Sequence, residues 1–215
     1  MPAETLDAAG VRAWVAAVAT AVAAERDHLT ELDAAIGDGD HGVNLARGFT
    51  AVTAALAASD AETPGSVAML VGRTLISSVG GASGPLYGTL FRAMGKSFGD
   101  QAAVDPEGVL AGLAAGFTGI EKLGSAVCGD KTMVDALAPA LAAWEAEVAD
   151  GGTLSSAARA AAEAAAQGAE ATIPMEARRG RASYLGPRSI GHEDPGAAST
   201  ALVLAALRDT IDAAG

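Results

Sequence analysis

The chain has 215 residues, a formal net charge of -12, 50% hydrophobic residues and 4% aromatic residues. This length is enough to bury the core of one domain. The acidic balance excludes a typical nucleic-acid-binding protein, because such a protein needs a basic face to meet the phosphates. An acidic chain can still hold an anionic ligand through a cation or through backbone N–H groups.

The cysteine content and the apolar stretches indicate the compartment. Cys128 is the single cysteine, so an intramolecular disulfide is excluded. The longest apolar stretch, residues 14–24, is too short to span a bilayer. Residues 1–10 lack the basic and apolar regions of an export signal. We therefore expect a cytoplasmic protein that does not enter a membrane.

The predicted elements are helices from one end of the chain to the other. Apolar residues recur at helical spacing, and the alternation typical of strands is nearly absent. The pattern predicts helices over residues 6–35, 42–58, 64–79, 86–98, 105–123, 132–148, 153–171 and 196–213. Gly37 ends the first of them, and glycine and proline punctuate residues 80–85. We expect one all-α domain over residues 1–215.

Residues 174–195 form the one long segment without a helical pattern. Loops of this length inside a domain are usually functional or disordered. The segment is rich in arginine, glycine and aromatic residues, so we expect an ordered, functional loop.

An acidic segment, residues 33–44, is the strongest local feature. It contains Asp33, Asp38 and Asp40, and Gly37 and Gly39 give the backbone the freedom to bring these carboxylates together. Carboxylates held close together repel one another unless a cation lies between them. Mg²⁺ prefers oxygen ligands of this kind and keeps positions open for phosphate.

This segment has two alternatives to a phosphate-linked metal site. The residues of this segment alone do not exclude the first alternative, a solvated acidic turn without a metal. An EF-hand is excluded, because Phe49 stands at the twelfth position from Asp38, where that loop needs a glutamate. Residues 42–44 begin a helix, and the free N–H groups of a helix start suit a phosphate. The segment therefore predicts a metal site beside an anion site.

Three further segments could contribute to the same site. Residues 77–86 form a Gly/Ser-rich turn that suits phosphate but also fits a tight helix–helix connection. Residues 129–133 could line a base or ribose pocket, or Asp130 or Thr132 could cap the next helix. Residues 178–188 contain four of the 14 basic residues, a cluster typical of a phosphate or carboxylate partner, unless it pairs with acidic helix ends.

Four motifs in this order resemble the DhaL family, the ADP-binding subunits of bacterial dihydroxyacetone kinases. They are residues 36–42 (IGDGDHG), 77–88 (SSVGGASGPLYG), 129–133 (GDKTM), and 180–186 with 189–197 (GRASYLG and SIGHEDPGA). The resemblance covers nearly the whole chain. It implies an antiparallel barrel of eight helices with a cap of loops over a nucleotide at one mouth.

The resemblance also implies the site residues. The family's three metal-binding aspartates, which hold two Mg²⁺, fall on Asp33, Asp38 and Asp40. Its nucleotide contacts fall on His41, Gly42, Val43, Asn44, Ala82, Ser83, Gly129, Met133, Arg181, Asp194, Pro195 and Gly196.

The reaction implied by the resemblance is phosphoryl transfer to dihydroxyacetone. In the form linked to the phosphotransferase system, ADP stays bound, becomes ATP transiently through a phosphohistidine protein (DhaM), and phosphorylates dihydroxyacetone held on DhaK. The short chain and His41 favour this form. The resemblance implies no general base on this chain, and a homodimer stays open.

Two other functions stay open. One is an ATP-exchanging kinase subunit for dihydroxyacetone or for a four-carbon ketose such as erythrulose. The other is a regulator that binds nucleotide without catalysis, although the complete aspartate triad favours catalysis. For His41, we favour a nucleotide contact over a phosphohistidine relay.

Overall fold

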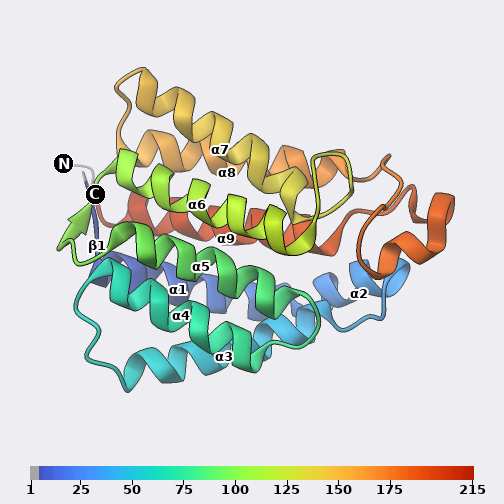
Figure 1. The fold of residues 1–215 in the computed structure, drawn as a ribbon, viewed down its shortest axis with the longest axis horizontal. Helices are drawn as coiled ribbons and strands as arrows, with labels where there is room; N and C mark the ends of the chain where they lie inside the picture. Colours follow the sequence, from blue (N-terminus) through green and yellow to red (C-terminus); the bar gives the residue numbers. More distant parts are fainter. Residues whose placement is uncertain (1–4) are drawn as a thin grey trace.

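The computed structural model describes residues 5–215, and that part of the chain is almost entirely helical (Figure 1). Its α-helices are α1 (Ala8–Ala24), α2 (Arg26–Ile36), α3 (His41–Ala57), α4 (Pro64–Ser78), α5 (Ser83–Phe98), α6 (Pro106–Gly124), α7 (Met133–Ala149), α8 (Leu154–Ala171) and α9 (Pro195–Ala213). A 3₁₀ segment, η1 (Arg181–Ser189), precedes α9. Two short strands, β1 (Leu6–Asp7) and β2 (Ala103–Val104), pair antiparallel with Leu6 opposite Val104.

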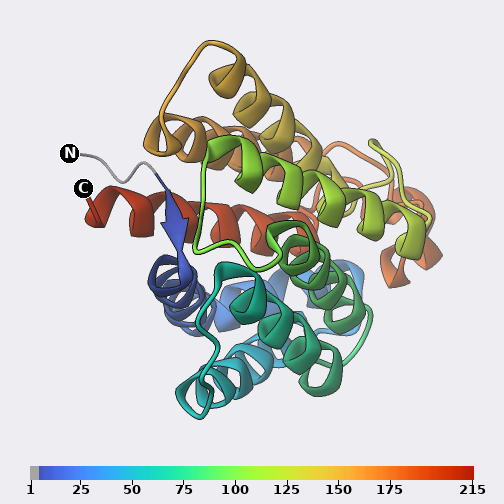
Figure 2. The same cartoon turned by 60° about the vertical axis from the view of Figure 1, so that its left-hand side comes forward.

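Eight of these helices close into a ring, which confirms the predicted antiparallel barrel. The ring runs through α1, α3, α4, α5, α6, α7, α8 and α9, and α9 packs back on α1. Helix α2 stands outside it and contacts α3, α9 and η1. Figures 1 and 2 show that α2 and η1 lie together at one end of the barrel, opposite the C-terminus.

The prediction of a single helix over residues 6–35 is wrong. The chain breaks at Glu25, and α1 and α2 meet at a bend of 63°. Val22 and Leu29 are both buried and seven residues apart, so the apolar spacing runs through the break. The bend carries the end of α2 to the mouth of the barrel, where Asp33 lies.

The other helices begin close to their predicted positions, and their caps explain why. The side chains of Thr63, Thr132, Thr153 and Asp105 accept hydrogen bonds from backbone N–H groups in the first turn of α4, α7, α8 and α6. Helix α5 is the exception, because it begins at Ser83 and includes Gly84 and Pro85. Proline is tolerated in a first turn, where its missing N–H is not needed.

The prediction of a loop without helical structure over residues 174–195 is wrong in one respect. Its middle forms η1, two 3₁₀ turns joined at Gly186, whose φ of 55° breaks the helix. Helix α8 ends at Ala171 before this segment, and α9 begins at Pro195 after it. The chain between them, residues 172–194, lies over the mouth of the barrel (Figure 1). We call residues 172–194 the cap.

The barrel core joins all the ring helices in one cluster. Trp14, Phe91 and Trp144 are fully buried in it, and the rings of Trp14 and Phe91 are 5.3 Å apart. Among the described residues, no single helix is long and apolar enough to cross a membrane, and the bent pair α1–α2 meets that test by length and composition only.

Candidate functional site

A cavity of about 810 Å³ opens at the capped end of the barrel. Its wall combines the α2–α3 turn, the start of α5, the end of α6, the start of α7, the cap and the start of α9. Its lining includes apolar side chains, among them Leu86, Ile120, Ala126 and Met133, together with acidic and arginine side chains. The cavity therefore suits a ligand with an apolar part and a charged part.

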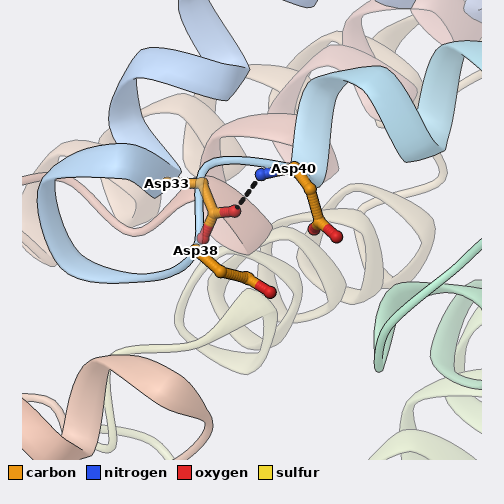
Figure 3. A group of neighbouring side chains, drawn as sticks. All are labelled: Asp33, Asp38 and Asp40. Carbon is orange, nitrogen blue, oxygen red and sulfur yellow. Dashed lines mark hydrogen bonds between the residues drawn. The ribbon is translucent and has the colours of Figure 1, made fainter.

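Asp33, Asp38 and Asp40 form an acidic cluster at the α2–α3 turn (Figure 3). All three residues line this cavity. One carboxylate oxygen from each residue lies within 4.8 Å of the others. Asp33 is buried on α2, while Asp38 and Asp40 are exposed in the turn before α3. Three carboxylates this close repel one another and suit a hard cation.

Backbone contacts hold the acidic turn in shape. Asp33 Oδ2 accepts a hydrogen bond from the backbone N–H of Asp40 at 2.8 Å (Figure 3). It accepts a second from the backbone N–H of His41 at 3.1 Å. A Cβ at position 37 would lie 2.1 Å from Asp33 Oδ1, so only glycine fits there. Gly39 has a φ of 72°, a conformation that favours glycine. Asp33 thus organises the turn as well as belonging to the cluster.

The cap reaches the acidic cluster through one ion pair. Arg181 Nε lies 2.9 Å from Asp38 Oδ2. The structure therefore brings together two residues from motifs that are more than 140 positions apart in the sequence.

His41 is held at the first position of α3 by a buried network of hydroxyl groups. Its Nε2 lies 2.9 Å from Ser199 Oγ, which lies 2.7 Å from the Tyr87 hydroxyl. The Tyr87 hydroxyl also lies 3.1 Å from Thr200 Oγ1. Burial lowers the pKa of His41 and raises the pKa of Tyr87 to about 12. The network joins α3, α5 and α9 at the cavity wall, which His41 and Tyr87 line.

Asp194 is a buried carboxylate at the start of α9. Its Oδ2 accepts a hydrogen bond from the backbone N–H of Ala197 at 2.7 Å and so caps the helix. Burial raises the pKa of Asp194 to about 7, with hydrogen bonds from the first turn of α9 and the charge of Lys131 opposing that shift.

Eleven of the predicted site residues line the cavity: Asp33, Asp38, Asp40, His41, Ala82, Ser83, Met133, Arg181, Asp194, Pro195 and Gly196. Gly42, Val43, Asn44 and Gly129 are not among the lining residues. Gly42 packs α3 against α2, since a Cβ there would lie 2.0 Å from the Arg26 carbonyl oxygen. The Gly129 N–H donates to Asp135 Oδ1 in the turn before α7.

The residues around the cavity that were not predicted include Lys131, Tyr87 and Ser199. Lys131 lies in the GDKTM motif, which alone predicts no role for it, and it lines the cavity. Ser199 contacts His41 from 158 positions away, and Tyr87, 46 positions from His41, contacts Ser199, so no local pattern could reveal these contacts.

The fold and the cavity define a helical-barrel protein with a carboxylate cluster, suited to a cation, at one capped mouth. The family model of the DAK2 domain matches residues 35–209, and the chain belongs to this family. The resemblance drawn from the four motifs is thereby confirmed.

The relatives are kinases or their subunits. The chain is 42% identical to the ADP-binding subunit DhaL of PEP-dependent dihydroxyacetone kinase 1 from Listeria innocua, over 92% of this chain and 93% of that one. It is 38% identical to D-erythrulose kinase from Mycolicibacterium smegmatis, over 91% of this chain but 34% of that one.

The barrel also matches a solved structure. The crystal structure of the dihydroxyacetone kinase from C. freundii in complex with AMP-PNP and Mg²⁺ superposes with a TM-score of 0.74 and 29% identity. The match covers 97% of this chain and 34% of that one.

Proposed function

We propose that this chain is the ADP-binding, phosphoryl-transferring subunit of a dihydroxyacetone kinase, with residues 1–215 acting as one nucleotide-binding domain. The observation that carries the proposal is the acidic cluster at the mouth of the cavity, in a chain that spans 93% of a DhaL subunit. A phosphohistidine protein of the DhaM type would rephosphorylate the bound ADP. The phosphoryl group would then pass to dihydroxyacetone on a DhaK-type partner and give dihydroxyacetone phosphate.

The acidic cluster would hold the metal. Asp33, Asp38 and Asp40 offer three oxygens within 4.8 Å, and Mg²⁺ prefers oxygen ligands while leaving positions open for phosphate. We propose two Mg²⁺ ions at this cluster. Bound Mg²⁺ would supply charge neutralisation, which is most of what phosphoryl transfer requires.

The nucleotide would use both the apolar and the charged residues of the cavity lining. The apolar residues Leu86, Ile120 and Met133 suit the base. The charged residues suit the phosphates, because Arg181 is among them and α3 begins at the cavity with His41, where the helix dipole favours an anion. His41 would contact the nucleotide from that helix start, fixed by Ser199. The remaining contacts implied by the family likeness, Gly42, Val43, Asn44 and Gly129 included, stay part of the proposal.

The partner would meet the rim of the cavity. Tyr184 on the cap is 86% exposed, and Leu123 and Val127 beside the end of α6 are 53% and 57% exposed. Large apolar side chains that are exposed favour contact with another protein. A DhaK-type subunit docked there would bring its ketose to the phosphates and would supply the groups that activate the sugar hydroxyl. We place this reaction in the cytoplasm, where nucleotide and Mg²⁺ are supplied.

Native mass spectrometry after long dialysis tests retention of the nucleotide. The proposal predicts that the chain keeps ADP. In reconstitution, dihydroxyacetone phosphate should form only with a DhaK subunit and a phosphorylated DhaM-type donor both present. Product formation by the chain alone with ATP would contradict the assignment of the sugar site to a partner.

A second candidate function is an ATP-exchanging subunit for dihydroxyacetone or erythrulose. The likeness to D-erythrulose kinase, over a third of that chain, favours this candidate. Fast exchange of bound ADP for ATP, with turnover supported by ATP in place of the phosphohistidine donor, would select it. A non-catalytic regulator would bind nucleotide but support no transfer in either system.

A further inference from the structure

Lys131 is a buried cation beside the cavity, and its ammonium group donates hydrogen bonds to backbone carbonyl groups. Only 1% of the residue is exposed. Its Nζ donates to the carbonyl oxygens of Thr172 at 2.8 Å, Met175 at 3.1 Å and Ile173 at 3.5 Å. It also donates to the His192 carbonyl oxygen. The three N–H donors of one ammonium group thus serve four carbonyls.

These four carbonyls lie at the two ends of the cap. Thr172, Ile173 and Met175 follow directly after α8, and His192 lies just before α9. The neighbouring Asp130 holds the part between them, since its carboxylate pairs with Arg179 at 3.1 Å. Asp130 and Lys131, in the turn before α7, therefore contact the start, the middle and the end of the cap.

This arrangement is costly for a residue that only fills space. Removing an ammonium group from water carries a large penalty, and an apolar side chain of similar size would avoid it. Burial lowers the pKa of Lys131, and the charge of Asp194 opposes that shift. Lys131 also has a backbone φ of 62°, a conformation that residues other than glycine rarely adopt. Strain of this kind gathers where a structure serves a function.

The cap in turn carries the arginine that faces the acidic cluster. Arg181 pairs with Asp38 across the mouth of the cavity at 2.9 Å. We propose that Lys131 is a positioning residue. Its ammonium group clamps the two ends of the cap and so holds Arg181 beside the acidic cluster, where the phosphates of the proposed nucleotide would lie. The clamp itself stands on geometry alone, whereas its effect on ligand binding rests on the proposed nucleotide site.

The first experiment replaces Lys131 with an uncharged side chain of similar length. Lys131→Met is compared with Lys96→Met, a control at an exposed position in the last turn of α5. We expect Lys131→Met to raise the dissociation rate of ADP and to weaken its affinity at least tenfold. Amide hydrogen exchange should rise in residues 172–192, and Mn²⁺ binding to the nucleotide-free acidic cluster should not weaken.

The outcomes separate positioning from general stability. ADP affinity within twofold of the wild type, in a folded variant, would overturn the proposal. So would faster exchange throughout the barrel together with loss of Mn²⁺ binding, because that pattern indicates only a stabilising role. If the wild type itself binds no ADP, the proposed function fails, while the exchange in residues 172–192 still tests the clamp.

A second measurement needs no variant at position 131. The chain has two other lysines, Lys96 and Lys122, both exposed. In ¹⁵N-labelled wild-type protein, a buried and hydrogen-bonded ammonium group should give a resolved signal that exchanges slowly with water. We expect one such signal, which persists in Lys96→Arg and in Lys122→Arg. Its absence would overturn the proposal even if Lys131→Met fails to fold.

Discussion

Arg181 Nε lies 2.9 Å from Asp38 Oδ2 and links the cap to the acidic cluster. The side chains are 68% and 37% exposed, so this ion pair adds little to folding stability. Because the ion pair lies at the cavity mouth, it affects ligand binding instead. A cation that binds the cluster must share Asp38 with Arg181 or displace it, whereas a phosphate gains Arg181 as a donor.

Replacement of Arg181 is therefore predicted to move two affinities in opposite directions. In Arg181→Met, Mn²⁺ should bind the nucleotide-free protein about two- to fivefold more tightly, because a competing cation is gone. ADP should bind roughly tenfold more weakly in the presence of Mg²⁺, because a charge-assisted hydrogen bond is lost. Calorimetry measures both. Arg188→Met on the same 3₁₀ segment is the control, and equal losses of both affinities would contradict this account.

Tyr87 is predicted to act on the site through His41. Tyr87→Phe removes only the hydroxyl group that contacts Ser199 and Thr200. We expect a loss of about 1–2 kcal/mol in the free energy of unfolding, the usual effect of a buried hydrogen bond. The ring ¹⁵N signals of His41 should shift and ADP should bind more weakly. Unchanged His41 signals in Tyr87→Phe would refute the link.

Asp194 is predicted to make stability depend on pH. Its pKa rises from 3.8 in the unfolded chain to about 7 in the nucleotide-free fold, because of burial. The folded state therefore binds the extra proton between these values, and the stability that Asp194 contributes is lost as the pH rises toward 7 and above. Between pH 5 and pH 8 this loss should reach about 2–3 kcal/mol.

Asp194→Asn isolates that dependence, because asparagine is as good an N-cap as aspartate. Urea unfolding at pH 5 and pH 8 should show the wild type losing stability relative to the variant at the higher pH. A constant difference between the two proteins at both pH values would show that Asp194 has an ordinary pKa.

The barrel could be predicted from the sequence because its signals are local. Caps such as Thr63 and Thr153, and apolar residues at helical spacing, fix most helix starts within a few residues. The break at Glu25 could not be predicted, because buried residues keep helical spacing across it and no glycine or proline marks it. The predicted start of helix α5 at residue 86 is three residues too late, because Gly84 and Pro85 are residues typical of a turn.

The acidic cluster could be predicted because all three aspartates lie within eight positions. The supporting contacts could not, because they join distant parts of the chain. Lys131 reaches the His192 carbonyl 61 positions away, and Ser199 reaches His41 across 158 positions. Such pairings depend on the closure of the barrel, which brings α9 beside α1 and the cap over the mouth.

The most direct test of the central claim is ADP binding by calorimetry with and without Mg²⁺, in the wild type and in Asp38→Asn. Asp38 is exposed, and the change keeps the shape of its side chain, so the variant should fold normally. The account predicts that Mg²⁺ tightens ADP binding at least a hundredfold in the wild type and about tenfold or less in the variant, since one metal ligand has lost its charge. Equal ADP affinity with and without Mg²⁺ in the wild type, or the same gain in both proteins, would contradict it.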